Sequence, residues 1–298
     1  MSTLLLTRHE VRALLEPTDA LAALLADLRA AFGATPQTQH PTATPPAHRV
    51  SLAPDPSSDE RDTLVLHDPA TGVPRAVMGA SPLRAARTAA AAALAAALLS
   101  EPDAARVALV GTGTLEAWVL RLLPLVRRVR TVTVFDPTPL RSGPFVRRLA
   151  EGIDAALVPT DSLAEAVLEA EIVVCATGSR EPFLYPGMVA PGAHLMTLGT
   201  GEGPRCELAA ALLRESRVIC DDRTLAVERG GVGGAGLGPA AVHAELGEVL
   251  SGRRPGREHP EQVTVYDGVG APWMDLVAAR RVLRRAQEAG VGRWVAAP

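Results

Sequence analysis

The feature that most constrains this fold is an apolar strand that runs into a glycine-rich turn and then a helix. Val107-Ala-Leu-Val110 is followed by Gly111-Thr-Gly-Thr-Leu-Glu116. The first glycine permits a tight turn, and the second lets the backbone approach a phosphate closely. The helix start adds N–H groups and the positive end of a dipole. The pattern predicts a Rossmann-type dinucleotide-binding domain from about Ala105 to Asp221-Asp222. The residues expected to contact the cofactor in this turn are Gly111, Thr112, Gly113, Thr114 and Leu115.

An acidic residue at the end of the next expected strand indicates which dinucleotide would bind. Asp136 follows Thr131–Phe135 directly. Its carboxylate can accept hydrogen bonds from ribose hydroxyls and would repel a 2′-phosphate, so NAD is expected, with NADP as the alternative. The third glycine position of the motif holds Glu116, followed by Ala117. A shifted helix start would let Ala117 make the close contact; without that shift, the charge of Glu116 would weaken pyrophosphate binding. A Rossmann-like domain that binds no dinucleotide therefore stays open as an interpretation.

Strands and helices alternate after this motif, which predicts a parallel sheet with right-handed crossovers. The fold class is therefore expected to be α/β with a doubly wound sheet. Further strands are expected at Ala156–Val158, Glu171–Ala176, His194–Leu198, Arg217–Cys220 and Val263–Tyr266, and helices at Leu115–Val126, Phe145–Gly152 and Ser162–Leu168.

The flanking segments have a different pattern. Leu4–Phe32 is expected to form a short strand followed by helices. Arg229–Gly238 is rich in glycine, whose backbone is conformationally free, so a mobile loop is expected there. His243 is interpreted as a packing residue within a helix. The remaining expected elements are a possible strand from Arg49, a hairpin of Asp62–His67 and Val73–Met78, a long helix at Leu83–Leu99 and an amphipathic helix at Trp273–Gly290.

The composition excludes several classes of protein. All 30 basic residues are arginine, so a lysine Schiff base or lysine general base is excluded. The formal charge is −3, and no basic run is interleaved with aromatic residues, so no nucleic-acid partner is expected. The three cysteines lack metal-ligand spacing and suggest a reducing compartment. The apolar run Ala85–Leu99 is shorter than the roughly 20 residues of a membrane span, so we expect no membrane partner and a cytoplasmic location.

The helix expected at Leu83–Leu99 begins with Leu83-Arg-Ala-Ala-Arg87-Thr-Ala-Ala. This segment resembles a signature of the ornithine cyclodeaminase/μ-crystallin family, with its arginine, threonine and two alanines. It is the most specific of several short segments that resemble this family, in the family's order, across nearly the whole chain. The others are Leu6-Thr-Arg-His-Glu-Val, His67-Asp-Pro-Ala-Thr-Gly72, Ala176-Thr-Gly-Ser179 with Glu181-Pro182, Pro191-Gly-Ala-His194, Glu207-Leu208, Asp221-Asp222, Glu245-Leu-Gly-Glu-Val249 and Val269-Gly-Ala271 with Asp275.

This resemblance implies a two-domain subunit, a dimer and chemistry at a carbon–nitrogen bond. A substrate-binding and dimerisation domain would comprise residues 1–104 and 271–298, and residues 105–270 would form the dinucleotide-binding domain inserted into it. Family members pass a hydride between NAD(P) and an α-amino or α-imino acid, and some cyclise a diamino acid. The implied partners are a small imino or amino acid and a second copy of the chain.

The resemblance also implies site residues. Arg87 matches the family's carboxylate-binding arginine, and a bidentate arginine suits a carboxylate, with a helix-surface arginine as the alternative. Arg49 lies near the place of a family lysine, with an ordinary loop arginine as the equal alternative. Further residues expected at the cofactor are Ala176, Thr177, Gly178, Ser179 and Gly199.

Departures from the family leave the reaction open. Its lysine is missing, and its catalytic aspartate falls where this chain has Gly230-Gly231. Glu228 is the candidate replacement for that acid, although an ordinary exposed glutamate is the commoner reading. Three hypotheses follow: an NAD(P)-dependent oxidoreductase, a binding protein that has lost catalysis, and a non-redox enzyme using Asp221, Asp222 or His243.

Overall fold

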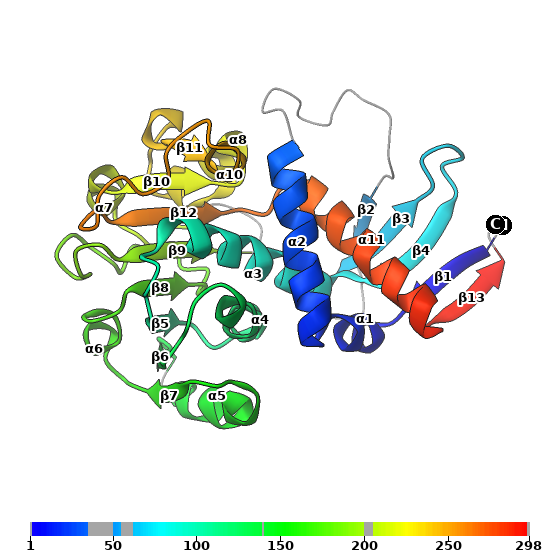
Figure 1. Cartoon of the computed structure of the whole chain (residues 1–298), viewed down its shortest axis with the longest axis horizontal. Helices are drawn as coiled ribbons and strands as arrows, with labels where there is room; N and C mark the ends of the chain where they lie inside the picture. Colours follow the sequence, from blue (N-terminus) through cyan, green and yellow to red (C-terminus); the bar gives the residue numbers. More distant parts are fainter. Residues whose placement is uncertain (1, 35–49, 55–61, 139, 200–204, 297–298) are drawn as a thin grey trace. The chain divides into compact units, whose positions relative to one another are not determined.

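The computed structural model describes residues 2–34, 50–54, 62–138, 140–199 and 205–296 (Figure 1). The chain divides into two compact units. The first consists of Met1–Arg87 and Ala271–Pro298, and the second of Thr88–Gly270. The first unit is therefore discontinuous in sequence, because the second is inserted into it.

The first unit contains a five-stranded sheet in the order β13-β1-β4-β3-β2. The β3–β4 hairpin turns at Asp68, whose Oδ1 accepts the backbone N–H groups of Ala70 and Thr71 at 3.0 and 3.1 Å. The expected hairpin is thus confirmed by an Asx-type turn. The elements of this unit are β1 (Ser2–Leu6), α1 (Arg8–Leu15), α2 (Thr18–Ala34), β2 (Val50–Pro54), β3 (Asp62–His67), β4 (Pro74–Gly79), α11 (Pro272–Ala289) and β13 (Arg293–Ala296).

Helix α11 lies beside α2 although about 250 residues separate them in sequence (Figure 1). The rings of Phe32 and Trp273 meet edge to face with centroids 4.7 Å apart. At the same contact, Arg281 on α11 forms an ion pair with Asp27 on α2 at 2.6 Å. The segment after the second unit thus completes the core of the first.

Helix α3 (Ala80–Leu99) holds the boundary between the two units, which falls between Arg87 and Thr88. It is long and apolar enough to cross a membrane by length and composition alone. In the folded chain, 83% of its most apolar window is buried. The structure therefore uses α3 as a core helix, as the sequence predicted.

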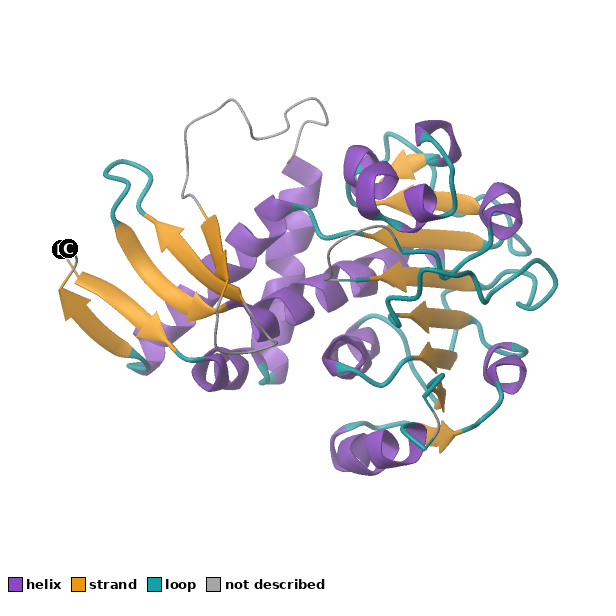
Figure 2. Cartoon of the chain, turned by 180° about the vertical axis from the view of Figure 1, so that it is seen from behind, coloured by secondary structure: helices purple, strands orange, loops and turns teal. Residues whose placement is uncertain are grey.

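The second unit contains an eight-stranded sheet in the order β11-β10-β12-β9-β8-β5-β6-β7, in which all paired neighbours are parallel. Helices lie on both faces of this sheet (Figure 2). Its elements are β5 (Arg106–Val110), α4 (Thr114–Leu122), η1 (Leu123–Leu125), β6 (Thr131–Phe135), α5 (Ser142–Leu149), η2 (Ala150–Gly152), β7 (Ala156–Pro159), α6 (Leu163–Val167), β8 (Ile172–Cys175), β9 (His194–Leu198), α7 (Ala210–Glu215), β10 (Arg217–Cys220), α8 (Arg223–Arg229), α9 (Gly231–Gly234), η3 (Pro239–Ala241), β11 (Ala244–Glu245), α10 (Leu246–Leu250) and β12 (Thr264–Gly268).

The strand order reverses between β5 and β8, which are neighbours in the sheet. In a doubly wound sheet, a ligand binds outside the carboxyl ends of the strands at such a switch point. Strand β12 lies between β9 and β10, although it is the last strand of this sheet in sequence. The predicted α/β class and doubly wound sheet are confirmed. The carboxyl edge of this sheet is therefore the expected location of a ligand site.

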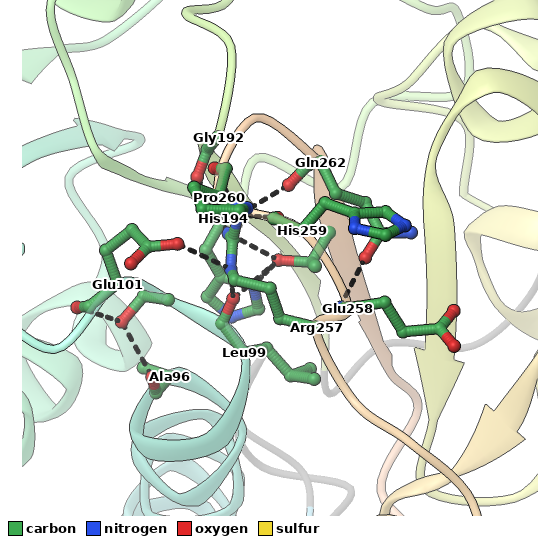
Figure 3. Close-up of polar contacts among 12 residues, drawn as sticks. Ala96, Leu99, Glu101, Gly192, His194, Arg257, Glu258, His259, Pro260 and Gln262 are labelled. Carbon is green, nitrogen blue, oxygen red and sulfur yellow. Dashed lines mark hydrogen bonds and ion pairs between the residues drawn. The ribbon is translucent and has the colours of Figure 1, made fainter.

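Two arginines satisfy the carbonyl groups at the end of α3. Arg257 donates from Nε to the Leu99 carbonyl at 2.8 Å and from Nη2 to the Gly192 carbonyl at 2.7 Å (Figure 3). Arg127 donates from Nη2 to the carbonyls of Ala97 and Ser100 at 2.9 and 3.1 Å. A helix leaves its last four carbonyls without intrahelical partners, so these contacts replace an ordinary C-cap.

His194 lies buried at the start of β9 beside this cluster (Figure 3). Its Nδ1 is 2.9 Å from the hydroxyl oxygen of Thr264, and that hydroxyl donates to the Leu99 carbonyl at 2.9 Å. The histidine must therefore donate from Nδ1, which leaves Nε2 unprotonated. Burial, then the charges of Arg257 and Arg127, lowers the pKa of His194 to about 3.

Two sequence interpretations in this unit are wrong. The glycine-rich segment expected to be a mobile loop contains α9, whose first two N–H groups, of Gly231 and Val232, bind Asp267. His243, expected inside a helix, precedes the short strand β11, and its Nδ1 accepts the Val218 N–H at 3.1 Å. Tertiary hydrogen bonds overrode local propensity at both places.

Candidate functional site

The turn between β5 and α4 has the geometry that the glycine motif predicts. Gly111 adopts a φ of +117°, a conformation that residues with a Cβ rarely take. Its N–H donates to the Phe135 carbonyl at 2.8 Å, which fixes the turn against the end of β6. Gly113 is the N-cap residue of α4 in extended conformation. The start of α4 therefore points its N–H groups into the concave side of the turn.

The side chain of Glu116, the third residue of α4, folds back into this turn. A Cβ atom on Gly111 would lie 2.2 Å from its Oε1, and one on Gly113 would lie 2.8 Å from its Oε2. The residue is only 2% exposed. Desolvation by burial raises the pKa of its carboxyl group to about 7, against the lowering effect of the N–H groups of Glu116 and Gly113.

Asp136 follows β6 beside the same turn. Its Oδ2 accepts the hydroxyl hydrogen of Thr112, and its Oδ1 accepts the N–H of Thr138 at 2.8 Å. A carboxylate has about four lone-pair positions, so both oxygens retain capacity for the hydroxyl groups of a ribose. Thr112 and Asp136, which the sequence placed in the candidate site, are thus in contact.

The segment after β8 is held by a buried glutamate that belongs to one of the resembling segments but had no role assigned from sequence. Glu207 accepts the N–H and the hydroxyl of Thr177 on Oε1, both at 2.7 Å. Its Oε2 accepts the hydroxyl of Thr197 on β9, also at 2.7 Å. The segment Ala176–Ser179 therefore has a fixed position at the carboxyl edge of the sheet, next to the Gly111 turn, where the Ala176 carbonyl lies 3.4 Å from a Cβ on Gly111.

A second buried pair lies at the ends of β9 and β12. Arg205 packs on Gly199, where a Cβ would come within 1.7 Å of Nη1, and its Nη2 lies 3.6 Å from Oδ1 of Asp267. Asp267 also accepts the N–H groups of Gly231 and Val232, both at 3.0 Å. Burial raises the pKa of Asp267 to about 6, which Arg205 partly offsets. In the described part of the chain, Nη1 of Arg205 has no hydrogen-bond partner.

In the first unit, two of the segments that resemble the family's motifs are in contact, the one with Arg87 and the one with Asp275. The Nε of Arg87, on α3, donates to Oδ1 of Asp275, on α11, at 2.7 Å. The side chains are 1% and 7% exposed. A charged pair at this depth has to be well matched, because an unpaired buried charge is costly. The pair joins positions that lie 188 residues apart in sequence.

Comparison with known proteins shows the family of the chain. The model of the Ornithine cyclodeaminase/mu-crystallin family matches residues 56–290. The chain belongs to the ornithine cyclodeaminase/mu-crystallin family. It is 30% identical over 234 residues to an alanine dehydrogenase of Archaeoglobus fulgidus, covering 77% of this chain and 71% of that protein. It is 31% identical to the ketimine reductase mu-crystallin of Mus musculus over 220 residues, or 74% and 68% of the two chains.

A solved structure supports the same assignment. The iminosuccinate reductase of Paracoccus denitrificans in complex with NAD⁺ superposes with a TM-score of 0.84 at 25% sequence identity. The match covers 99% of this chain and 100% of that one. The family resemblance inferred from short motifs is therefore confirmed along the chain.

Other residues that sequence analysis singled out are placed differently. Glu228, on α8, is exposed, and Asp222 caps the same helix by accepting the Leu225 N–H at 2.9 Å. Asp221 accepts the N–H groups of Val269 and Gly270 at 3.1 and 2.5 Å, so it holds backbone. Arg49 lies outside the described residues.

The residues at the switch point fit a dinucleotide of the kind that the family relative binds. A turn with Gly111 in a glycine conformation, the N–H groups at the start of α4 and Asp136 after β6 form the expected cradle. The side chain of Glu116 lies within the same turn, against the backbone of Gly111 and Gly113. Glu207, Arg205 and Asp267, to which no role was assigned from sequence, hold the segments at this edge of the sheet through buried polar contacts.

Proposed function

We propose that this protein is an NAD(P)H-dependent oxidoreductase that acts at the carbon–nitrogen bond of an α-imino or α-amino acid. The observation that carries the proposal is the Gly111 turn at the switch point, with Asp136 beside it, in a chain of this family. The named relatives are an alanine dehydrogenase, a ketimine reductase and an iminosuccinate reductase, all of which handle such a bond.

Each part of the chain has a role in this proposal. The nicotinamide ring supplies or accepts the hydride when the cofactor is bound. Gly111, Thr112, Gly113, Thr114 and Leu115 would hold the pyrophosphate side, and Asp136 would hold the adenosine ribose. The residues proposed for the nicotinamide side are Ala176, Thr177, Gly178, Ser179 and Gly199.

Arg87 is the proposed ligand of the substrate carboxylate, with Asp275 fixing its guanidinium group. The role of Glu228 in proton transfer stays a prediction. The residue lies exposed on α8. Asp136 favours NAD over NADP, because its charge opposes a 2′-phosphate. The formation of a homodimer also stays a prediction. So does the cytoplasmic location, which would suit a soluble enzyme of amino-acid chemistry.

The test is a fluorescence titration of the full chain with NADH and NADPH, followed by turnover assays with cyclic imino acids such as pyrroline-2-carboxylate and piperideine-2-carboxylate. We expect NADH binding in the micromolar range and oxidation of NADH with one of these acids. Arg87→Lys keeps a charge beside Asp275 but loses the planar fork, so it should raise KM for the imino acid and leave NADH affinity unchanged. No binding of either cofactor at millimolar concentration would overturn the proposal.

A binding protein without turnover is the second candidate. Two observations favour it: glycine at positions 230 and 231, where the family has its acid, and the carboxyl group of Glu116 within the turn. NADH binding without oxidation by any imino acid would support this second function. Steady turnover would exclude it.

A further inference from the structure

The carboxyl group of Glu116 occupies the anion-binding face of the turn that the proposed function assigns to a pyrophosphate. A Cβ on Gly111 would lie 2.2 Å from its Oε1, and one on Gly113 would lie 2.8 Å from its Oε2, so both oxygens lie against the backbone of these two glycines. Glycine at these positions leaves room for a close approach to the backbone. In this structure, the group that makes the approach belongs to the chain itself.

The surroundings make this carboxyl group and a pyrophosphate mutually exclusive when both are ionised. The N–H groups at the start of a helix favour one anion, and a second negative charge at the same place is repelled. The other charged groups that act on Glu116 in the described part of the chain are Asp136, after β6, and Glu207, ahead of α7, and both are negative. No arginine among the contributing groups offsets the repulsion.

We propose that Glu116 is a built-in competitor for the pyrophosphate subsite, so that dinucleotide binding requires its carboxyl group to take up a proton or leave the turn. The inference rests on the proposed function, because it concerns the same turn. It makes Glu116 the residue that determines cofactor affinity. Glutamate in place of a small residue at the third motif position then affects the binding of the dinucleotide as well as the packing of the helix on the sheet.

The pH dependence follows from the position of the carboxyl group. Burial raises the pKa of Glu116 to about 7, so the group is mostly neutral at pH 6 and mostly ionised at pH 8. If the complex requires the neutral form, the neutral fraction falls about tenfold between these pH values, and Kd for NADH rises by about the same factor. Affinity is lost as the pH rises through the pKa, because the ionised form is the competitor.

The test compares the wild-type chain with Glu116→Gln, Glu116→Ala and the control Glu10→Gln. Glu10 is also the third residue of its helix, α1, and caps that helix by accepting the Thr7 N–H at 2.8 Å. The control therefore removes a glutamate charge at the same helix position in the other unit. Kd for NADH is measured by nicotinamide fluorescence at pH 6 and 8, and proton uptake by calorimetry in buffers of different ionisation enthalpy.

We expect wild type and Glu10→Gln to bind NADH about tenfold more weakly at pH 8 than at pH 6, with uptake of close to one proton at pH 8. Glu116→Gln and Glu116→Ala should bind about tenfold more tightly than wild type at pH 8 and lose the pH dependence. Equal affinity and an equal pH profile in wild type and both Glu116 variants would overturn this inference alone. Failure of all four folded proteins to bind NADH or NADPH would overturn the proposed function as well.

Discussion

The buried histidine of the second unit makes the stability of the protein depend on pH in a way that can be calculated. His194 is held as the neutral tautomer, with Nδ1 donating to Thr264 and Nε2 facing the core. Protonation would place a charge and an N–H without a partner beside Arg257 and Arg127. The unfolded chain has no such restriction, so its histidine accepts a proton at the ordinary pKa of 6.5.

The magnitude follows from linkage between proton binding and unfolding. The folded pKa of about 3 lies below the unfolded value, so the stability due to neutral His194 is complete well above pH 6.5 and is lost as the pH falls. At pH 5 the unfolded state carries nearly one more proton at this residue. The free energy of unfolding should fall by about 2 kcal/mol between pH 7.5 and pH 5 through this residue alone.

The measurement is urea unfolding of wild type and His194→Asn at both pH values. The asparagine amide can donate to Thr264 as Nδ1 does, but it does not titrate. The variant should lose about 2 kcal/mol less than wild type over this range, because all other groups contribute equally to both. His9→Asn, at an exposed position, should leave the wild-type difference unchanged. Equal losses in wild type and His194→Asn would refute the assigned protonation state.

Three further predictions concern the remaining charged groups. Arg257→Met should lower the free energy of unfolding by about 3 kcal/mol or more, since buried carbonyls lose a charged donor. The exposed Arg254→Met should change it little, and equal urea midpoints for the two variants would contradict this. Asp136→Ser should raise the affinity ratio of NADPH to NADH about tenfold in fluorescence titrations, and an unchanged ratio would remove Asp136 from the ribose site. Arg87→Met should cost about 3–5 kcal/mol by urea unfolding, and adding Asp275→Leu should restore most of it, whereas additive losses would show that the pair does not interact.

Much of the second unit could be predicted because its strands are short, apolar and bounded by turn residues. Thr131–Phe135, His194–Leu198 and Arg217–Cys220 are observed with the bounds expected from sequence. Their β-branched and apolar runs indicate strands, and the helices between them indicate parallel pairing. The position of β12 between β9 and β10 has no local signal.

The supporting side chains of the site could not be found in the same way. Glu207 binds Thr177, 30 residues away, and Asp267 binds Gly231, 36 residues away. A motif records residues that are close in sequence, whereas these contacts depend on which strands become neighbours. The charge of Glu116 could be noted in the sequence, but its return into the Gly111 turn depends on the rotamer and on burial.

The internal position of β12 in its sheet also affects folding during synthesis of the chain. Until Thr264–Gly268 have left the ribosome, β9 and β10 lack the strand that joins them, and both present open edges. The first unit must wait still longer, because α11 begins only at Pro272. Most of the nascent chain is thus synthesised before either unit can close, and unpaired strand edges at that stage favour aggregation.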